Sequence, residues 1–160
     1  MEQKRRNIVI LVTSLVLVAG MIVRAYPEEG WERAITVTVA GAENRLSFGQ
    51  KTDATDGCDG GYDVPPMLGG NITAYFSDEG GNYWRDIKAF TRGTKTWVLH
   101  IESPLPDRDV TLTWGPQLPP GMIKIMLNDA SAGTSVDMQA LHRYAYRNTG
   151  PRDLMIEVTY

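Results

Sequence analysis

Residues 51–66, called the acidic loop, read K-T-D-A-T-D-G-C-D-G-G-Y-D-V-P-P. The aspartates of this loop are Asp53, Asp56, Asp59 and Asp63. Carboxylates this close together repel one another unless water, backbone amides or a cation compensates their charge. The spacing is not that of an EF-hand, but the glycines of the loop allow its backbone to turn several carboxylates toward a hard cation. The sequence predicts these aspartates as ligands of a structural calcium ion; aspartates that cap nearby backbone amides are the alternative.

Groups that could carry out catalysis are sparse in the rest of the chain. His100 and His142 are the only histidines, and each lies on a strand-like stretch with no partner at a fixed spacing. No Gly-rich loop leads into a helix, as a phosphate-binding motif would require. An acidic pair such as Asp107 and Asp109 is more typical of a turn than of a glycosidase site. The sequence therefore predicts a protein that is not an enzyme.

Several aromatic residues could bind a sugar by stacking against it. Tyr62, Tyr83 and Trp84 are the candidates for such a platform, which would make the protein a carbohydrate-binding module. In a β-sandwich, however, aromatic rings more often belong to the core or to cross-strand pairs. Trp97 and Trp114 are in phase with aliphatic neighbours, so we assign both to the core.

Two residues are candidates for covalent modification. Asn71 begins the tripeptide N-I-T, which is a sequon for N-glycosylation if its strand face is exposed to solvent. Cys58 is the only cysteine, so no disulfide can form within the chain. Its place after Gly57 in a polar loop predicts an exposed thiol, and both an inert role and an intermolecular disulfide are open.

The N-terminus has the pattern of an export signal. Lys4, Arg5 and Arg6 precede an uncharged run over residues 8–23, and Ala25 ends a V-R-A cleavage pattern. As a helix the run would span roughly 24 Å, which is short of the about 30 Å of membrane hydrocarbon, so cleavage is favoured over an uncleaved anchor. We expect a secreted or cell-surface protein with no membrane segment after cleavage.

The predicted domain organisation is simple. Residues 1–25 form the signal peptide, residues 26–33 a flexible lead-in, and residues 34–160 a single β-sandwich domain. Cleavage would remove four basic side chains and one acidic side chain, which changes the formal net charge from −3 to about −6. Such a surface repels nucleic acid, and the basic residues are scattered singly, so no nucleic-acid partner is expected.

Hydrophobic and polar residues alternate along most of the remaining chain, which is the period of a half-buried β-strand. The expected strands cover residues 35–39, 46–48, 71–76, 83–90, 95–102, 110–114, 123–127, 136–138, 144–146 and 154–158. These are about ten short strands with a turn signal about every eight to twelve residues, and no convincing helical period accompanies them. The pattern predicts an all-β fold, an antiparallel Ig-like β-sandwich, with a closed barrel as the alternative.

The first expected strand has a second interpretation. Ile35, Val37 and Val39 belong to a short, uncharged, β-branched segment that follows the lead-in. Such a segment can pair with a sheet edge of a neighbouring subunit, and repetition of that contact would build a filament. The alternative is an ordinary first strand in its own sheet.

A longer set of motifs resembles a known family. The run R-L-S-F-G-Q-K-T-D-A-T-D-G precedes a Y-W-R-D-I-K strand, K-T-W-V-L-H-I and V-T-L-T-W. This order is similar to a β-sandwich module of exported bacterial and archaeal surface proteins, found near Ig-like domains that resemble that of the flagellar hook-capping protein. The D-A-T-D-G element is the most specific part, and Cys58 departs from the pattern. The resemblance implies a structural or attachment unit without a catalytic centre.

These observations lead to one expected function and one alternative. We expect a non-catalytic extracellular structural or adhesive module, with a self-assembling filament or sheath subunit as the sharper form of that prediction. Its partners would be copies of itself or other cell-surface proteins. The alternative is a carbohydrate-binding module whose partners are glycans.

Overall fold

The structure is a computed structural model that describes residues 30–67, 69–116 and 124–160. The predicted signal peptide lies outside these residues. The described residues form strands and no helix, which confirms the all-β prediction. The strands are β1 (Trp31–Val39), β2 (Ala42–Lys51), β3 (Thr73–Asp78), β4 (Gly81–Tyr83), β5 (Arg85–Ala89), β6 (Thr94–Glu102), β7 (Asp109–Trp114), β8 (Lys124–Asp129), β9 (Thr134–Asp137), β10 (Arg143–Arg147) and β11 (Arg152–Thr159). Among the described residues, no helix is long and apolar enough to cross a membrane.

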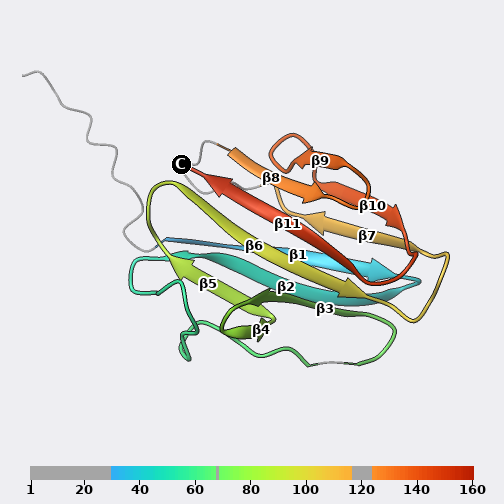
Figure 1. Cartoon of the computed structure of the whole chain (residues 1–160), viewed down its shortest axis with the longest axis horizontal. Helices are drawn as coiled ribbons and strands as arrows, with labels where there is room; N and C mark the ends of the chain where they lie inside the picture. Colours follow the sequence, from blue (N-terminus) through green and yellow to red (C-terminus); the bar gives the residue numbers. More distant parts are fainter. Residues whose placement is uncertain (1–29, 68, 117–123) are drawn as a thin grey trace, which may run out of the picture.

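The strands form two sheets that face each other, as Figure 1 shows. Sheet A has five strands in the order β10-β7-β1-β2-β5, and sheet B has six strands in the order β4-β3-β6-β11-β8-β9. Neighbouring strands are antiparallel except for β2 and β5, which pair in parallel. The two sheets make the predicted β-sandwich, with β10 and β5 as the edges of sheet A.

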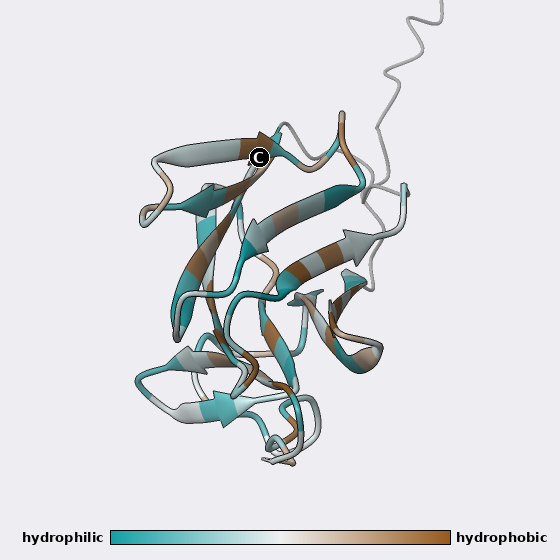
Figure 2. Ribbon diagram, turned by 90° about the vertical axis from the view of Figure 1, so that its right-hand side faces the viewer, coloured by the Kyte–Doolittle hydropathy of each residue, from teal (hydrophilic) through white to brown (hydrophobic). Residues whose placement is uncertain are grey.

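Alternation within the strands places the core between the sheets. In β1, the odd-numbered residues from Trp31 to Val39 are buried and the even-numbered residues are at least partly exposed. Figure 2 shows the resulting bands of hydrophobic and hydrophilic residues along the strands. Trp97, which is 1% exposed, lies 5.2 Å from the ring of Phe48 across the layer, and Trp114 is 5% exposed. Both tryptophans therefore belong to the core, as predicted.

Three predicted boundaries were wrong. The lead-in ends earlier than expected, because β1 already begins at Trp31 and the ring of that residue is buried. The sequence G-A-E-N at residues 41–44 predicts the turn between the first two strands, but the turn lies at Ala40 and Gly41, whose positive φ angles of 48° and 85° fit a tight two-residue hairpin. The strand expected over residues 83–90 is broken at Trp84, where the chain passes from sheet B to sheet A.

Candidate functional site: the two edges of sheet A

The acidic loop lies along the outer edge of β5. Val64 forms an isolated antiparallel bridge with Arg85, in which the Val64 N–H donates to the Arg85 carbonyl at 3.1 Å. The Trp84 N–H in turn donates to the Val64 carbonyl at 2.6 Å. The end of the loop therefore starts to pair with β5 as a strand would. Only one bridge forms, and the rest of the edge is closed in a different way.

Carboxylates of the loop close that remainder. The Arg85 carbonyl and the N–H groups of Ile87 and Ala89 point away from β2, because the partners of these three groups lie in the loop. The Ile87 N–H donates to Asp63 Oδ1 at 3.0 Å, and the Ala89 N–H donates to Asp56 Oδ1 at 3.3 Å. An exposed row of unpaired N–H groups is a template for pairing with another chain. Here aspartate side chains accept the bonds that an added strand would make.

The other carboxylate contacts fix the loop to itself and to sheet B. The Asp59 N–H donates to Asp63 Oδ2 at 2.6 Å, and Asp59 Oδ2 accepts the Thr55 N–H. Asp53 accepts the hydroxyl of Tyr62. Lys95 Nζ lies 2.6 Å from Asp56, and its hydrogen bond lowers the pKa of that carboxyl despite partial burial. Each aspartate therefore has a partner of its own.

This arrangement differs from the predicted cation site. Among the described residues, no three acidic, histidine or cysteine side chains are grouped as metal ligands would be. The carboxylates instead cap backbone amides, which is the alternative that the sequence left open. Calcium binding by Asp53, Asp56, Asp59 and Asp63 stays a prediction, and it would require some of these bonds to be exchanged for bonds to the ion.

Buried charges lie on the inner side of the same edge strand. Asp86 and Lys88 of β5 are 3% and 9% exposed, and Lys88 Nζ lies 6.0 Å from the centre of the Trp97 ring. Asp86 Oδ2 has no hydrogen-bond partner, and Lys88 Nζ is 3.8 Å away. Burial raises the pKa of Asp86 to about 6, and the nearby Lys88 charge only partly opposes this. Inward-pointing charges are a further device that discourages pairing at an edge.

The opposite edge of sheet A is open. The Trp114 N–H donates to the His142 carbonyl at 3.2 Å, and the Asn148 N–H donates to the Arg108 carbonyl at 2.8 Å. Hydrogen bonds between antiparallel strands recur at every second residue, so the backbone N–H and carbonyl groups of Tyr144 and Tyr146 also point toward β7. The backbone groups of the three exposed residues of β10 therefore point away from the sheet. These residues are Arg143, Ala145 and Arg147, and no described strand pairs with their edge.

The first strand is not at an edge. β1 lies between β2 and β7 and pairs with both along residues 35–39. The side chains of Ile35, Val37 and Val39 are at most 1% exposed. In this fold neither edge of the segment is free, and its pairing with another subunit stays a prediction. The alternative, an ordinary strand in its own sheet, describes β1.

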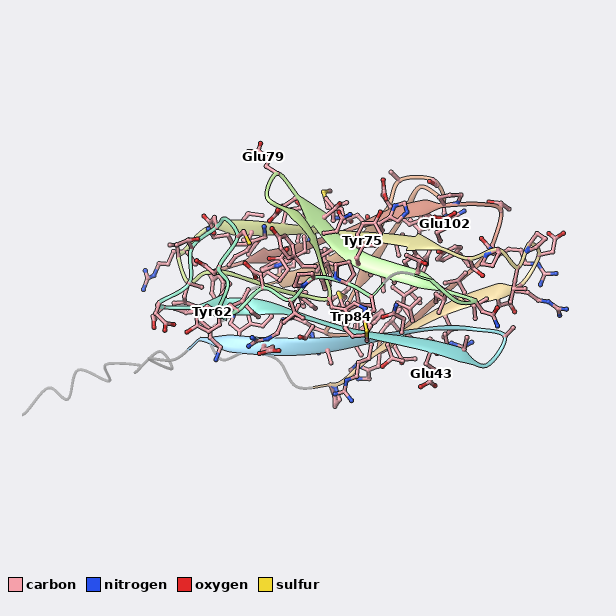
Figure 3. All side chains as sticks on the ribbon, turned by 90° about the horizontal axis from the view of Figure 1, so that it is seen from below. Glu43, Tyr62, Tyr75, Glu79, Trp84 and Glu102 are labelled. Carbon is pink, nitrogen blue, oxygen red and sulfur yellow. The ribbon has the colours of Figure 1, made fainter. Side chains whose placement is uncertain are left out.

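The three candidate aromatic residues do not form one stacking platform. Tyr83 is 4% exposed, so its ring is not available to a sugar. Figure 3 shows Tyr62, which belongs to the acidic loop, apart from Trp84. The Tyr62 ring is contacted by the cations of Lys51, at 5.7 Å, and Arg85, at 5.8 Å. Trp84 alone keeps a partly exposed side chain beside a hollow in the surface.

The two candidate modification sites are both exposed. Cys58 has an exposed side chain, as predicted. Asn71 is exposed just before β3, and its carbonyl accepts the Ser103 hydroxyl at 2.7 Å. Glycosylation of Asn71 stays a prediction. The sequence pattern gave His100 no partner, but its Nδ1 lies 2.7 Å from Asp153 Oδ1 on the adjacent strand β11.

Comparison with known proteins adds no family to this description. The chain matches no protein-family model, and no significant match is found among curated proteins or solved structures. The fold itself defines the class as an all-β sandwich in which one edge of sheet A is capped by carboxylates and the other is open. The resemblance to exported surface modules stays a prediction.

Sequence analysis missed the residues that distinguish the two edges. Asp86 and Lys88 alternate with Ile87 in a segment whose hydrophobic pattern is weak, and that weakness was the available signal for an edge strand. Ala145, flanked in the chain by Tyr144 and Tyr146, carries no such signal. Whether a strand is at an edge depends on the order of strands in the sheet, which the pattern of one segment does not contain.

Proposed function

We propose that this protein is an exported, non-catalytic structural or adhesive module that associates with copies of itself through the open edge of β10. The observation that carries the proposal is the contrast between the edges of sheet A, one closed by Asp56 and Asp63 and the other unpaired. Export is supported by the signal pattern of residues 1–25. Other cell-surface proteins are the alternative partners at the same edge.

The charges on β10 favour one geometry of association. A two-fold antiparallel pairing of β10 with itself, centred on Ala145, would place Arg143 opposite Arg147 of the second copy. Like charges directly opposite each other destabilise a strand pair. A head-to-tail contact, in which β10 pairs with a different segment of the next copy, avoids this cost. Such a contact does not close on itself and builds a filament.

The test is a backbone variant at the centre of the edge. Ala145→Pro removes an N–H that faces away from β7 and makes no bond with a described residue, so the fold should be kept while strand addition is blocked. The matched control is Ala145→Thr, which keeps the N–H and adds a side chain similar in size to that of proline. Both variants and the wild-type protein are examined by negative-stain microscopy and sedimentation, with circular dichroism to confirm folding.

We expect polymers from the wild-type protein and from Ala145→Thr, and folded monomers from Ala145→Pro. A wild-type protein that stays monomeric up to millimolar concentration would overturn self-association. Polymers that persist in Ala145→Pro would show that association uses another surface.

A further inference from the structure

A groove runs across the outer face of sheet A, perpendicular to its strands. Cross-strand pairing places Ala34 of β1 beside Ser47 of β2, Ser47 beside Arg85 of β5, and Arg85 beside Val64 of the acidic loop. These four residues line one hollow of about 510 Å³. With strands about 4.8 Å apart, the row is roughly 14 Å long. A second hollow of about 300 Å³ shares Ala34 with the first and extends the groove toward β7.

One wall of the groove is a fixed pair of opposite charges. Glu32 accepts from Arg85 Nε at 2.9 Å and from Arg85 Nη2 at 2.7 Å, and it also accepts the Ser47 hydroxyl at 2.8 Å. These hydrogen bonds lower the pKa of Glu32, with Arg85 as the main cause, so the carboxylate stays ionised at neutral pH. The oxygens of Glu32 and Ser47 can accept further bonds from hydroxyl groups of a ligand. The wall therefore offers ordered hydrogen-bonding groups.

The opposite wall carries an unpaired cation. Arg45 is exposed and lines both hollows, and its guanidinium forms no ion pair or hydrogen bond with any described residue. Its neighbour across the strands is Thr36, which has no charge to compensate the guanidinium. A guanidinium binds a carboxylate with two parallel hydrogen bonds. Arg45 therefore marks the place where a negative group of a ligand would sit.

The end of the groove at the acidic loop is apolar. Val64 is 44% exposed, and Trp84 is partly exposed beside it. The Trp84 carbonyl accepts the Ser47 N–H at 3.0 Å, which holds this residue at the junction of β2 and β5 (Figure 3). Apolar and aromatic groups next to hydrogen-bonding groups suit the face of a sugar ring.

We propose that this groove binds a carboxylate-bearing polysaccharide, with Arg45 holding the carboxylate and the Glu32–Arg85 pair contacting hydroxyl groups. A peptide is less suited to the groove, because strand addition needs free backbone groups at an edge. The groove lies on a sheet face and offers side chains instead. This binding goes beyond self-association, since Arg45 is on β2 and the open edge is on β10.

The test uses an oligogalacturonate as the probe. Its fully methyl-esterified form, which lacks the charge, and a poly-glutamate peptide, which carries carboxylates on a different backbone, are the comparison ligands. Binding is measured by calorimetry for the wild-type protein, Arg45→Ala and Arg45→Lys. Arg108→Ala is the matched control, because it removes an exposed cation far along the chain in the loop before β7.

We expect the wild-type protein to bind the oligogalacturonate and to prefer it to both comparison ligands. Arg45→Ala should weaken binding at least about tenfold, Arg45→Lys less, and Arg108→Ala not measurably. No binding of the oligogalacturonate by the wild-type protein would overturn the proposal. Equal losses in Arg45→Ala and Arg108→Ala, or equal affinity for poly-glutamate, would also overturn it. Ala145→Pro should bind as the wild type does, which separates this result from that of self-association.

Discussion

β5 and β10 are the two edges of the same sheet, and the chain treats them differently. At β5, side-chain carboxylates accept the outward N–H groups of Ile87 and Ala89. At β10, the outward groups of Arg143, Ala145 and Arg147 have no described strand beside them. The difference shows that an edge can be closed without a further strand, by a loop whose acidic side chains copy the acceptors of a ladder. The proposed self-association uses the edge that stays open, at β10.

Burial explains why the closed edge needs strong acceptors. Ile87 is 1% exposed and Asp63 is 7% exposed, so the N–H group and the carboxylate meet largely out of water. A buried N–H without a partner costs about 1–3 kcal/mol, and a bond to a charged acceptor is stronger than one to a neutral acceptor. The outward groups of β10 belong to residues whose side chains are exposed, so water can satisfy them. That edge can stay open in a monomer at little cost.

The largest expected effect comes from removal of the cap on β5. Asp63→Ala takes the acceptor away from the Ile87 N–H and from the Asp59 N–H, so we expect a loss of about 3 kcal/mol in the free energy of unfolding. Urea denaturation measures this loss. Asp53→Ala is the control, because Asp53 contacts Tyr62 at the surface. Equal losses in the two variants would mean that the cap does not stabilise the edge.

A second effect concerns the buried charge inside the closed edge. The pKa of Asp86 is about 6 in the folded protein against 3.8 for a free carboxyl, so the folded state holds a proton more tightly between these values. The cost of burying the ionised Asp86 carboxylate is therefore absent below about pH 4, grows as the pH rises toward 6, and is complete at pH 7. Asp86→Asn removes this cost.

We expect Asp86→Asn to raise the free energy of unfolding by about 2 kcal/mol at pH 7 and by almost nothing at pH 4. Denaturation at the two pH values provides the measurement. A variant that is destabilised at pH 7 would show that the attraction between Asp86 and Lys88 exceeds the cost of burying the carboxylate.

Calcium tests whether the closed edge also holds an ion. If the acidic loop binds calcium, the ion at ten times its dissociation constant should add about 1.4 kcal/mol to the free energy of unfolding. The gain should be absent in a variant with Asp53→Asn and Asp59→Asn, which keeps the carboxylates that cap Ile87 and Ala89. Melting curves in calcium and in a chelator measure the effect, and identical curves would rule out a structural calcium ion.

The smallest expected effect is at the pair of Asp56 with Lys95. The Asp56 side chain is 58% exposed, so solvent screens the pair and Asp56→Asn should cost only about 0.5 kcal/mol at pH 7. Because the folded pKa of Asp56 is lowered, this contribution is present above about pH 4 and is lost as the pH falls below it. Unfolding of Asp56→Asn, Lys95→Met and the double variant measures the coupling; strictly additive losses would contradict it.

The fold could be predicted from the sequence because burial of one face dictates the alternation of residues. Ile35, Val37 and Val39 alternate with threonines, and this alone predicts a half-buried strand. The break at Trp84 could not be predicted, since Tyr83 and Arg85 belong to different sheets although they are almost adjacent in the chain. The parallel pairing of β2 with β5 likewise depends on the arrangement of the whole chain.

The candidate site was only partly predictable. The density of aspartates in the acidic loop indicated that their charge needed partners, and backbone capping was one of the two options. The sequence could not show that Asp56 and Asp63 accept from residues of β5, which are 33 and 24 positions away. It also left β1 open both to association and to a place within its own sheet, because a hydrophobic segment near the N-terminus does not reveal how many strands lie beside it.

Hydrogen exchange of single backbone amides tests the contrast between the edges most directly. In the folded monomer we predict slow exchange for the N–H groups of Ile87 and Ala89, and fast exchange for those of Arg143, Ala145 and Arg147. In the assembled protein the Ala145 amide should become slow. Protected amides at these three residues of β10 in the monomer, or fast exchange at Ile87 and Ala89, would contradict a sheet with one capped edge and one open edge.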